Sequence, residues 1–364
     1  MDVNSRIEEL KKEIRETPYH KGTEHHIGLL RARIAKLEDD QFARNARSKS
    51  GGGGGFAIRR TGDATVVLVG PPSVGKSTLL NALTNAKSTV APYSFTTVTV
   101  IPGMMKYKNA YIQILDVPGL IEGASKGRGR GREVLSVVRG SSLLVFIAEV
   151  GKEDSFSKME AELVEAGIRI NTEKPKIRIE KKLKGGIVIR KQTQQQLDSE
   201  TIESIAHEFG LRNAEITLKE RFNLEKLIDA FAQNRVYVKA IYVMNKTDLS
   251  TSKVKQAGAN VHLRGVEHLK ISAKDGQGLG ELREAIWEAL GFMRVYLAKN
   301  GNVDYDKPLI MARGSTLFDV AKKIGVEFAS HTKRAKISGP GAKFPNQEVN
   351  LRTLAADLQV ITFL

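Results

Sequence analysis

The nonapeptide GPPSVGKST, residues 70–78, decides the fold of this chain. It matches the pattern G-x-x-x-x-G-K-[ST], follows the apolar run TVVLV and opens the helix-like run KSTLLNALT. A strand, a glycine-rich turn and a helix in this order present backbone N–H groups and a helix N-terminus to phosphate oxygens. The pattern therefore predicts a phosphate-binding loop made by Gly70, Pro71, Pro72, Ser73, Val74, Gly75, Lys76, Ser77 and Thr78.

Further strand-like and helix-like runs follow this loop along the chain. In order they are YIQILDVPG from residue 111, SLLVFIAEV from residue 142, VKAIYVMNKTD from residue 238, HLKISAKDG from residue 268 and LGELREAIWEALG from residue 279. Buried strands that end in polar loops, with helices between them, are typical of a doubly wound, mostly parallel α/β sheet that binds its ligand at the strand C-terminal ends. We predict this fold class for residues 63–290.

Other segments surround or interrupt this core. Apolar spacing in residues 1–48 predicts a hairpin of two amphipathic helices, with a DNA-reading helix-turn-helix as the sharper alternative, and the glycine-rich residues 49–62 predict a linker. The segment between FIAEV and IYVMNKTD is too long for one helix and its loops, so we predict an inserted small α+β domain at residues 170–234. Strand-like runs around one helical run in residues 291–364 suggest a β-grasp module.

The inserted segment contains a strongly basic stretch. The run KIRIEKKLKGGIVIRKQ, from residue 176, alternates about a Gly-Gly turn and predicts a β-hairpin. Its cations form a candidate RNA surface, with a solvated strand face as the alternative. These cations, which face one acidic residue, Glu180, are Lys174, Lys176, Arg178, Lys181, Lys182, Lys184, Arg190 and Lys191.

The composition bounds the partners of the chain. Its 364 residues carry a formal net charge of +16 and include no cysteine. This charge favours a polyanionic partner, because each Lys or Arg that faces a phosphate releases a condensed counterion. The sequence shows neither a signal peptide nor an uncharged apolar run long enough to span a bilayer. We expect a cytoplasmic protein without disulfides and without a membrane partner.

The run NKTD, residues 245–248, follows another buried strand and fits a guanine-binding loop. The carboxylate of Asp248 can accept hydrogen bonds from both N1–H and the 2-amino group of guanine, and adenine lacks these donors. The later run SAK places the backbone N–H of Ala273 where it can meet guanine O6. The nucleotide is therefore expected to be GTP or GDP, bound through Asn245, Lys246, Asp248, Ser272, Ala273 and Lys274.

Candidate Mg²⁺ ligands lie in three places along the chain. Ser77 follows the loop lysine, Asp116 ends the strand YIQIL, and the run FTTVTV offers Thr97, with Thr96 as the near alternative. The seven histidines show no metal-ligand pattern, so we expect no transition metal. We assign Mg²⁺ binding to Ser77, Thr97 and Asp116.

Catalytic roles are assigned to Lys76, Thr97 and Gly119. Lys76 can reach the β- and γ-phosphates, and the backbone N–H of Gly119 can meet the γ-phosphate and sense its loss. The loops around Thr97 and Gly119 are the expected switches, which are ordered by γ-phosphate and Mg²⁺ and relax after hydrolysis.

The motifs GPPSVGKST, FTT, DVPGLIEGA, NKTD and SAK together resemble those of the Obg-type GTPases, specifically the developmentally regulated GTP-binding protein (DRG) family. The run GLIEGASKGRGRGREVLSVVR, from residue 119, is the most diagnostic, and the similarity covers nearly the full length. The resemblance implies a translation-associated GTPase on or near ribosomes, with RNA contacts and a dedicated stabilising partner protein. It also implies an insert like the second domain of a small-subunit ribosomal protein and a C-terminal TGS domain. We expect a monomer.

Leu120 stands where many GTPases carry a water-orienting glutamine, and its apolar side chain cannot polarise water. Some relatives use a K⁺ ion held partly by a phosphate-loop asparagine, and that position is Ser73 here. The alternatives are the γ-phosphate itself, a ribosomal element, or one of the loop cations Lys126, Arg128, Arg130 and Arg132. Turnover without a completed site should be slow, within an order or two of ~10⁻⁴ s⁻¹.

Two other classes of function compete with a GTPase switch. The first is an RNA- or ribosome-binding scaffold whose binding is insensitive to nucleotide, and the intact Lys76 argues against it. The second is a metabolic ATPase, which Asp248 disfavours because adenine cannot donate to it as guanine does.

Overall fold

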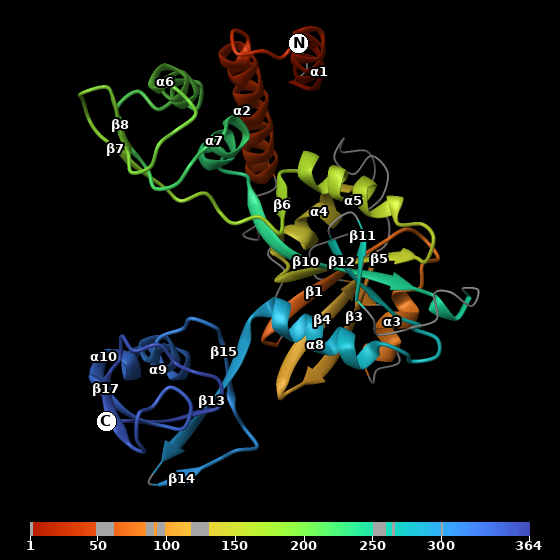
Figure 1. Cartoon of the computed structure of the whole chain (residues 1–364), viewed down its shortest axis with the longest axis vertical. Helices are drawn as coiled ribbons and strands as arrows, with labels where there is room; N and C mark the ends of the chain where they lie inside the picture. The colour runs from red at the N-terminus through yellow and green to blue at the C-terminus, as the bar shows by residue number, and fades with distance from the viewer. Residues whose placement is uncertain are drawn as a thin grey trace. The chain divides into compact units, whose positions relative to one another are not determined.

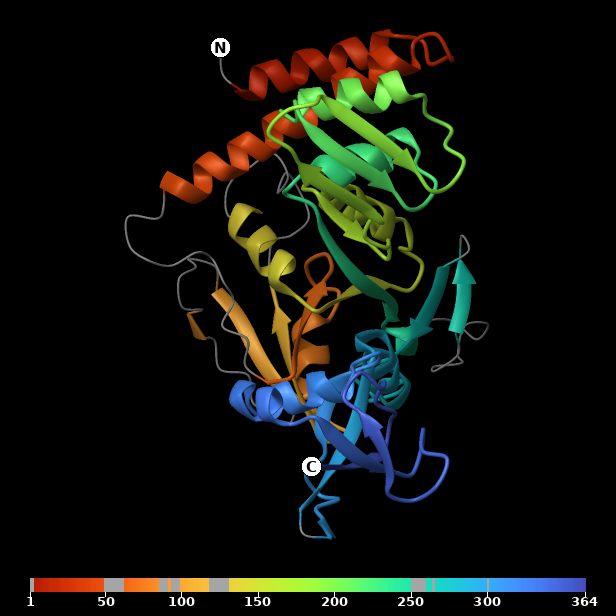
Figure 2. The same ribbon diagram turned by 90° about the vertical axis from the view of Figure 1, so that its left-hand side faces the viewer.

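The computed structural model describes residues 3–48, 62–84, 91–92, 99–117, 131–249, 260–263, 266–299 and 301–364. The chain forms two compact units (Figures 1 and 2). The core unit comprises Phe56–Ala166 and Val238–Leu364, and the insert unit comprises Met1–Gly55 and Gly167–Tyr237. No helix among the described residues is long and apolar enough to cross a lipid bilayer.

One large sheet organises the core unit. Among the described residues its strands are β1 (Ala64–Val69), β2 (Ala91–Pro92), β3 (Thr99–Tyr107), β4 (Ala110–Asp116), β5 (Leu143–Glu149), β6 (Ile168–Ile170), β10 (Val236–Asn245), β11 (Asn260–Leu263) and β12 (Val266–Lys270). Their order is β11-β12-β10-β5-β1-β4-β3-β2, and β6 pairs with β10. Strands β12, β10, β5, β1 and β4 run parallel, whereas β3, β2 and β11 are antiparallel to their neighbours. The predicted mostly parallel α/β fold is thus confirmed.

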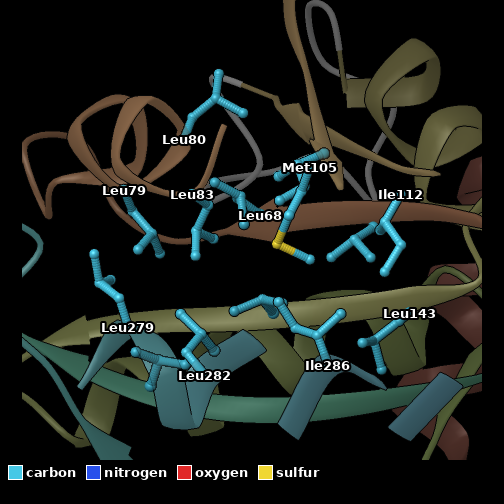
Figure 3. Close-up of a cluster of buried hydrophobic side chains, with 14 of the residues drawn as sticks. Leu68, Leu79, Leu80, Leu83, Met105, Ile112, Leu143, Leu279, Leu282 and Ile286 are labelled. Carbon is cyan, nitrogen blue, oxygen red and sulfur yellow. The ribbon is translucent and has the colours of Figure 1, made fainter. Parts of the chain in front are cut away.

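Helices cover both faces of this sheet, as Figure 1 shows. They are α3 (Lys76–Leu83), α4 (Gly131–Gly140), α5 (Asp154–Glu165) and α8 (Leu279–Leu290). Successive side chains of a strand point to opposite faces, so Val66 and Leu68 of β1 join the leucines of α3 and α8 in one buried cluster (Figure 3). Each such fully buried leucine contributes about 1.5–3 kcal/mol. On the opposite face, Tyr242 of β10 stacks on Phe146 and meets the ring edge of Phe156 in α5.

The C-terminal part of the core unit is a separate small sheet with its own hydrophobic cluster. Its elements are β13 (Phe292–Lys299), β14 (Asn302–Val303), β15 (Leu309–Ala312), α9 (Leu317–Ile324), α10 (Val326–His331), β16 (Arg334–Ser338), β17 (Gln347–Asn350) and β18 (Gln359–Phe363). The first and last long strands, β13 and β18, pair in parallel, and α9 packs on one face. A capping box starts α9, because Thr316 accepts from the backbone of Asp319 at 3.2 Å and donates its own backbone N–H back at 2.8 Å. This arrangement is a β-grasp fold.

The insert unit joins the N-terminal helices to the segment that interrupts the core. Its elements are α1 (Val3–Glu16), α2 (Glu24–Ser48), β6, β7 (Ile177–Lys181), β8 (Ile187–Lys191), α6 (Ser199–Glu208), β9 (Ala214–Leu218) and α7 (Leu224–Phe231). Ala32 and Ala35 of α2 belong to the same buried cluster as α6, α7 and β9. Gly28 of α2 allows close approach, since a Cβ there would lie 2.8 Å from the side chain of Leu224 in α7.

The predicted β-hairpin in the insert is wrong. The strands β7 and β8 both exist, but β9 lies between them, antiparallel to β7 and parallel to β8. The physical reason is burial: Ala214, Ile216 and Leu218 of β9 supply the most buried side chains of this sheet, whereas the isoleucines of β7 and β8 are half-buried at its edges. A strand distant in sequence therefore takes the central position.

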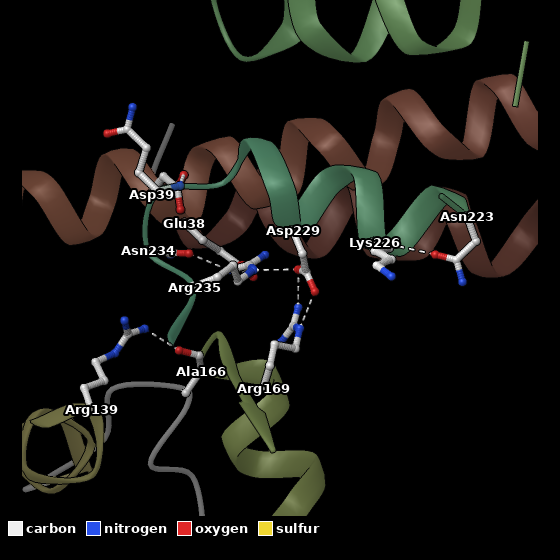
Figure 4. Close-up of polar contacts among 11 residues, drawn as sticks. Glu38, Asp39, Arg139, Ala166, Arg169, Asn223, Lys226, Asp229, Asn234 and Arg235 are labelled. Atoms are coloured by element: carbon white, nitrogen blue, oxygen red, sulfur yellow. Dashed lines mark hydrogen bonds and ion pairs between the residues drawn. The ribbon is translucent and has the colours of Figure 1, made fainter. Parts of the chain in front are cut away.

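A buried ionic network within the insert unit joins α7, β6 and the segment before β10 (Figure 4). Asp229 of α7 accepts from Arg169 of β6 at 2.5 and 2.6 Å and from Arg235 at 2.9 Å. Arg235 also approaches Glu38 of α2 at 3.8 Å. The side chains of Arg235, Asp229 and Arg169 are only 7%, 13% and 19% exposed, and Asp229 is the carboxylate that the two guanidinium groups share.

We predict that Asp229→Ala destabilises the insert unit by about 3–5 kcal/mol, because two nearly buried guanidinium groups lose the carboxylate that they share. The matched control is Glu225→Ala in the same helix, whose exposed pair with Arg31 should contribute at most about 1 kcal/mol. Urea unfolding, with hydrogen exchange to locate the loss in residues 168–237, measures both variants. Equal effects of the two substitutions would contradict the assigned role of the network.

Candidate nucleotide-binding site

The loop between β1 and α3 is shaped by two glycines. A Cβ at Gly70 would lie 2.7 Å from the carbonyl oxygen of Ile147 in β5, so this residue must lack a side chain. Gly75 has φ +96°, and a Cβ there would lie 2.4 Å from the side-chain nitrogen of Asn245. Ser73 also adopts a positive φ of 61°. The backbone is thus held in a conformation that leaves the tip of the loop, at Pro72 and Ser73, exposed.

Lys76 lies within this loop rather than in solvent. Its ammonium group donates to the carbonyl oxygens of Gly70 at 3.0 Å and Pro71 at 2.9 Å. Burial lowers the pKa of Lys76, and the negative charge of Asp116 opposes that change. Two backbone carbonyls therefore hold a buried positive charge inside the loop, where phosphate oxygens are better partners for it.

Ser77 and Asp116 form the second feature of the site. The hydroxyl of Ser77, at the start of α3, donates to Oδ2 of Asp116 at 2.6 Å. Asp116 ends β4, which is adjacent to β1, and its Oδ1 is buried with no hydrogen-bond partner among the described residues. A buried carboxylate oxygen without a partner is costly. A hard divalent cation such as Mg²⁺, which prefers oxygen ligands, suits this pair of residues.

Asn245 connects the phosphate-binding loop to the loop after β12. Its side-chain nitrogen donates to the carbonyl oxygen of Val74 at 2.9 Å, and its side-chain oxygen accepts from the backbone N–H of Ala273 at 3.0 Å. Asn245 is 2% exposed, and the backbone segments that it joins are buried. One carboxamide therefore sets the spacing between the two loops.

Asp248 and Ser272 lie at the other side of this connection. Asp248 lies in the short 3-10 turn η1 (Thr247–Leu249). Its Oδ1 accepts from the hydroxyl of buried Ser272 at 2.9 Å. The same hydroxyl accepts from the backbone N–H of Asp275 at 3.2 Å. The carboxylate of Asp248 is exposed but held in one orientation, and neighbouring Lys274 is exposed.

Sequence reasoning missed one residue of this region, Glu149. Lys246 has the strained φ of 66°, and its ammonium group lies 3.6 Å from the carboxylate of Glu149 at the end of β5. A hydrogen bond from Lys152 at 2.8 Å, with Lys246 as a further cation, holds the pKa of Glu149 below its usual value. The sequence could have indicated Glu149, because it ends an apolar strand, and parallel neighbouring strands bring their C-terminal residues to the same edge of the sheet.

Several predicted site residues lie outside the described residues. These are Thr96, Thr97, Gly119 and Leu120, together with the loop cations Lys126, Arg128 and Arg130; the side chain of Arg132 is likewise not described. The structure thus brings together Gly70 to Thr78, Asp116, Asn245, Asp248 and Ser272 to Lys274, and the assignments to the other residues stay predictions.

Comparison with known proteins identifies the family. Residues 65–182 match the model described as 50S ribosome-binding GTPase, residues 184–292 match the C-terminal region of that domain, and residues 293–362 match the TGS domain. The developmentally regulated GTP-binding protein 1 of Xenopus laevis is 38% identical over 98% of this chain and 97% of its own length. The chain belongs to the DRG family.

Other relatives are similar to this chain over nearly its full length. Human developmentally regulated GTP-binding protein 2 is 38% identical over 96% of both chains. An uncharacterized GTP-binding protein of Halobacterium salinarum is 41% identical over 99% of this chain and 98% of its own length. The family prediction is confirmed, and the β-grasp part is a TGS domain. This DRG-family chain is thus a GTP-binding protein with a P-loop GTPase domain.

We predict that Asn245→Ala weakens the binding of GDP and GTP alike, by a factor of the order of 10 to 100. The substitution leaves Val74 and Ala273 with unpaired backbone groups, each of which costs about 1–3 kcal/mol when buried. Competition against a fluorescent GDP analogue measures the affinities. Asn302→Ala, which changes an exposed asparagine of the TGS domain, is the control. Unchanged affinity of the Asn245 variant would show that the bridge does not shape the site.

Proposed function

We propose that this protein hydrolyses GTP to GDP and phosphate and acts as a molecular switch associated with ribosomes or RNA in translation, in the cytoplasm. One observation supports the chemistry above others. Ser77 donates to one oxygen of Asp116 at 2.6 Å, while the other oxygen of this buried carboxylate has no described partner. A hydroxyl after the loop lysine, beside such a carboxylate, suits Mg²⁺ at the phosphates of a nucleotide.

Each residue of the site has a separate role in the proposed phosphoryl transfer. Lys76 would leave its two carbonyl partners for the β- and γ-phosphate oxygens, and Ser77, Asp116 and Thr97 would hold Mg²⁺. The bound ion supplies positive charge that stabilises charge developing on the phosphate oxygens. The backbone N–H of Gly119 contacts the γ-phosphate, so its loss after hydrolysis releases the loop and changes the state of the switch.

Activation of the attacking water requires a substitute for glutamine, because Leu120 has no polar group. We propose two candidates: a K⁺ ion beside the phosphates near Ser73, or a group supplied by the ribosome. The loop cations are weaker candidates, since the glycines between them give the backbone too much conformational freedom to hold a cation in one position.

The net charge of the chain and the family model that it matches support a proposal about its partners. The net charge of +16 supports contact with RNA, and the family model that matches residues 65–182 is described as ribosome-binding. We propose that the insert unit, whose fold we compare to the second domain of a small-subunit ribosomal protein, and the TGS domain make these contacts. The protein acts as a monomer that a dedicated partner protein stabilises. The alternative is a scaffold that binds ribosomes equally in every nucleotide state.

We predict that Asp248→Asn shifts preference from guanosine to xanthosine nucleotides. An asparagine still accepts from Ser272, so the loop keeps its shape, but it offers an N–H donor to O2 of xanthine in place of the second acceptor for guanine. GTP affinity should fall tenfold to several hundredfold, while XTP affinity rises. Competition binding with both nucleotides measures the shift, and an unaltered order of preference would refute the guanine assignment.

We predict slow intrinsic hydrolysis, within an order or two of ~10⁻⁴ s⁻¹, that a completed site accelerates about 10³-fold or more. Phosphate release is measured in KCl and in NaCl, with and without ribosomes, and Lys76→Ala serves as the blank. Acceleration by K⁺ alone assigns the missing group to the cation, and acceleration by ribosomes assigns it to a partner.

A Lys76→Ala variant that hydrolyses GTP at the wild-type rate would overturn the enzymatic proposal. Ribosome co-sedimentation addresses the scaffold alternative separately. Equal binding with GDP and with a non-hydrolysable GTP analogue supports the scaffold, and unequal binding supports the switch.

A further inference from the structure

The outer face of the insert sheet is less basic than its sequence suggests. Glu180 pairs with Arg178 and, at 3.3 Å, with Lys182. Glu215 of the central strand β9 pairs with Arg190 at 2.6 Å and with Lys182 at 3.7 Å. The hydrogen bond from Lys182, aided by the charge of Arg178, holds the pKa of Glu180 below its usual value. These cations are therefore largely neutralised within the sheet.

Three further cations lie at one end of the same sheet. Lys181 ends β7, Lys184 lies in the β7–β8 loop, and Arg212 comes two residues before β9. In the described part of the chain no carboxylate forms an ion pair with any of these three exposed side chains, which we call the basic end.

Strand register brings the three residues of the basic end together. Ala214 is the partner of Lys181 in β7 and of Ile187 in β8, so the end of β7 meets the starts of β8 and β9. The loop residues are tied to the same point, because Lys182 donates its backbone N–H to the carbonyl oxygen of Asn213 at 2.9 Å. The side chain of Asn213 accepts from Gly186 at 2.9 Å. The cations thus share one edge of a fixed scaffold.

The loop itself serves no packing role among the described residues. Leu183 is 100% exposed, and a Cβ at Gly185 or Gly186 would meet nothing within 4 Å. Both glycines have positive φ, +107° and +72°, which lets the chain turn past β9. The basic end therefore projects its charge without contributing to the core.

We propose that the basic end binds the phosphate backbone of RNA through Lys181, Lys184 and Arg212, and that the neutralised outer face does not. This inference rests on the proposed function and names the RNA-contacting surface within it. Unpaired, exposed cations release counterions from a polyanion, whereas cations already paired with Glu180 and Glu215 gain less. An anionic membrane fits less well, because membrane binding grows with the apolar area that is buried, and the β7–β8 loop at the basic end offers one apolar side chain, Leu183.

The test compares two double variants of the full chain that remove equal charge from the same sheet. Lys184→Gln with Arg212→Gln changes the basic end, and Arg178→Gln with Arg190→Gln changes the outer face. Each variant is titrated against a fluorescent RNA duplex of about 20 base pairs at several KCl concentrations. The basic-end variant should reduce the slope of log affinity against log salt by about 2 and weaken binding by a factor of the order of 10 to 100 near 0.1 M salt. The outer-face variant should change the slope by less than half as much.

Equal losses in the two variants would overturn the proposal, because they would show that binding follows total charge. An unchanged slope in the basic-end variant would overturn it too. The basic-end residues are exposed, so unfolding midpoints and GDP affinity should equal those of the wild type, which confirms that any loss is local.

The outcomes also separate this inference from the proposed function. If the wild type shows no salt-dependent RNA binding, the inference fails together with the RNA part of that function, while the hydrolysis assays decide the GTPase part independently. If the wild type binds RNA and the basic-end variant does so equally well, the inference alone fails. Loss of binding to phosphatidylserine vesicles without loss of RNA binding would assign the surface to membranes and overturn it.

Discussion

A single carboxamide, that of Asn245, holds the phosphate-binding loop and the guanine-side loop in one arrangement. It donates to the carbonyl oxygen of Val74 and accepts from the N–H of Ala273, so its planar geometry fixes the separation of two backbone segments. The absence of a side chain at Gly75 follows from this contact, since a Cβ would lie 2.4 Å from the amide nitrogen. Two motifs that are 171 residues apart in sequence therefore constrain each other.

This arrangement depends in turn on parallel pairing. Val69 of β1 lies beside Phe146 of β5, and Asn245 of β10 lies beside Glu149 of β5, so the strands deliver their polar continuations to one edge. Apolar side chains bury the strands themselves, whereas the loops beyond them must satisfy their own backbone groups. The unusual features gather at this edge for that reason: positive φ at Gly75 and Lys246, a buried lysine, and a carboxylate oxygen without a described partner.

The parts of the molecule that sequence predicted correctly are those whose signals are local. A strand, a glycine-rich turn and a helix near residue 70 specify one another over a few residues, and the rules for parallel sheets then place Asp116 and Asn245. The predicted pairing of β7 with β8 was wrong because β9 takes the central position between them. The side chain of Ile216 in β9 is fully buried there, whereas the isoleucines of β8 are half-buried. The packing of α2 on α7 is equally non-local, and little in either helix alone reveals that Gly28 meets Leu224.

The insertion is compatible with the nucleotide site because of where the chain crosses between units. It leaves the core after α5 and returns at the start of β10, where Val236 donates to Gly167 at 3.1 Å. Asn245 is the last of the ten residues of β10, so it lies about 30 Å along the strand from this crossing. The insertion therefore joins β10 at the end opposite Asn245. Within the core unit, Arg139 of α4 donates to the carbonyl oxygen of Ala166 at 2.5 Å, so the last core residue before the insertion is held by a side chain of the core itself.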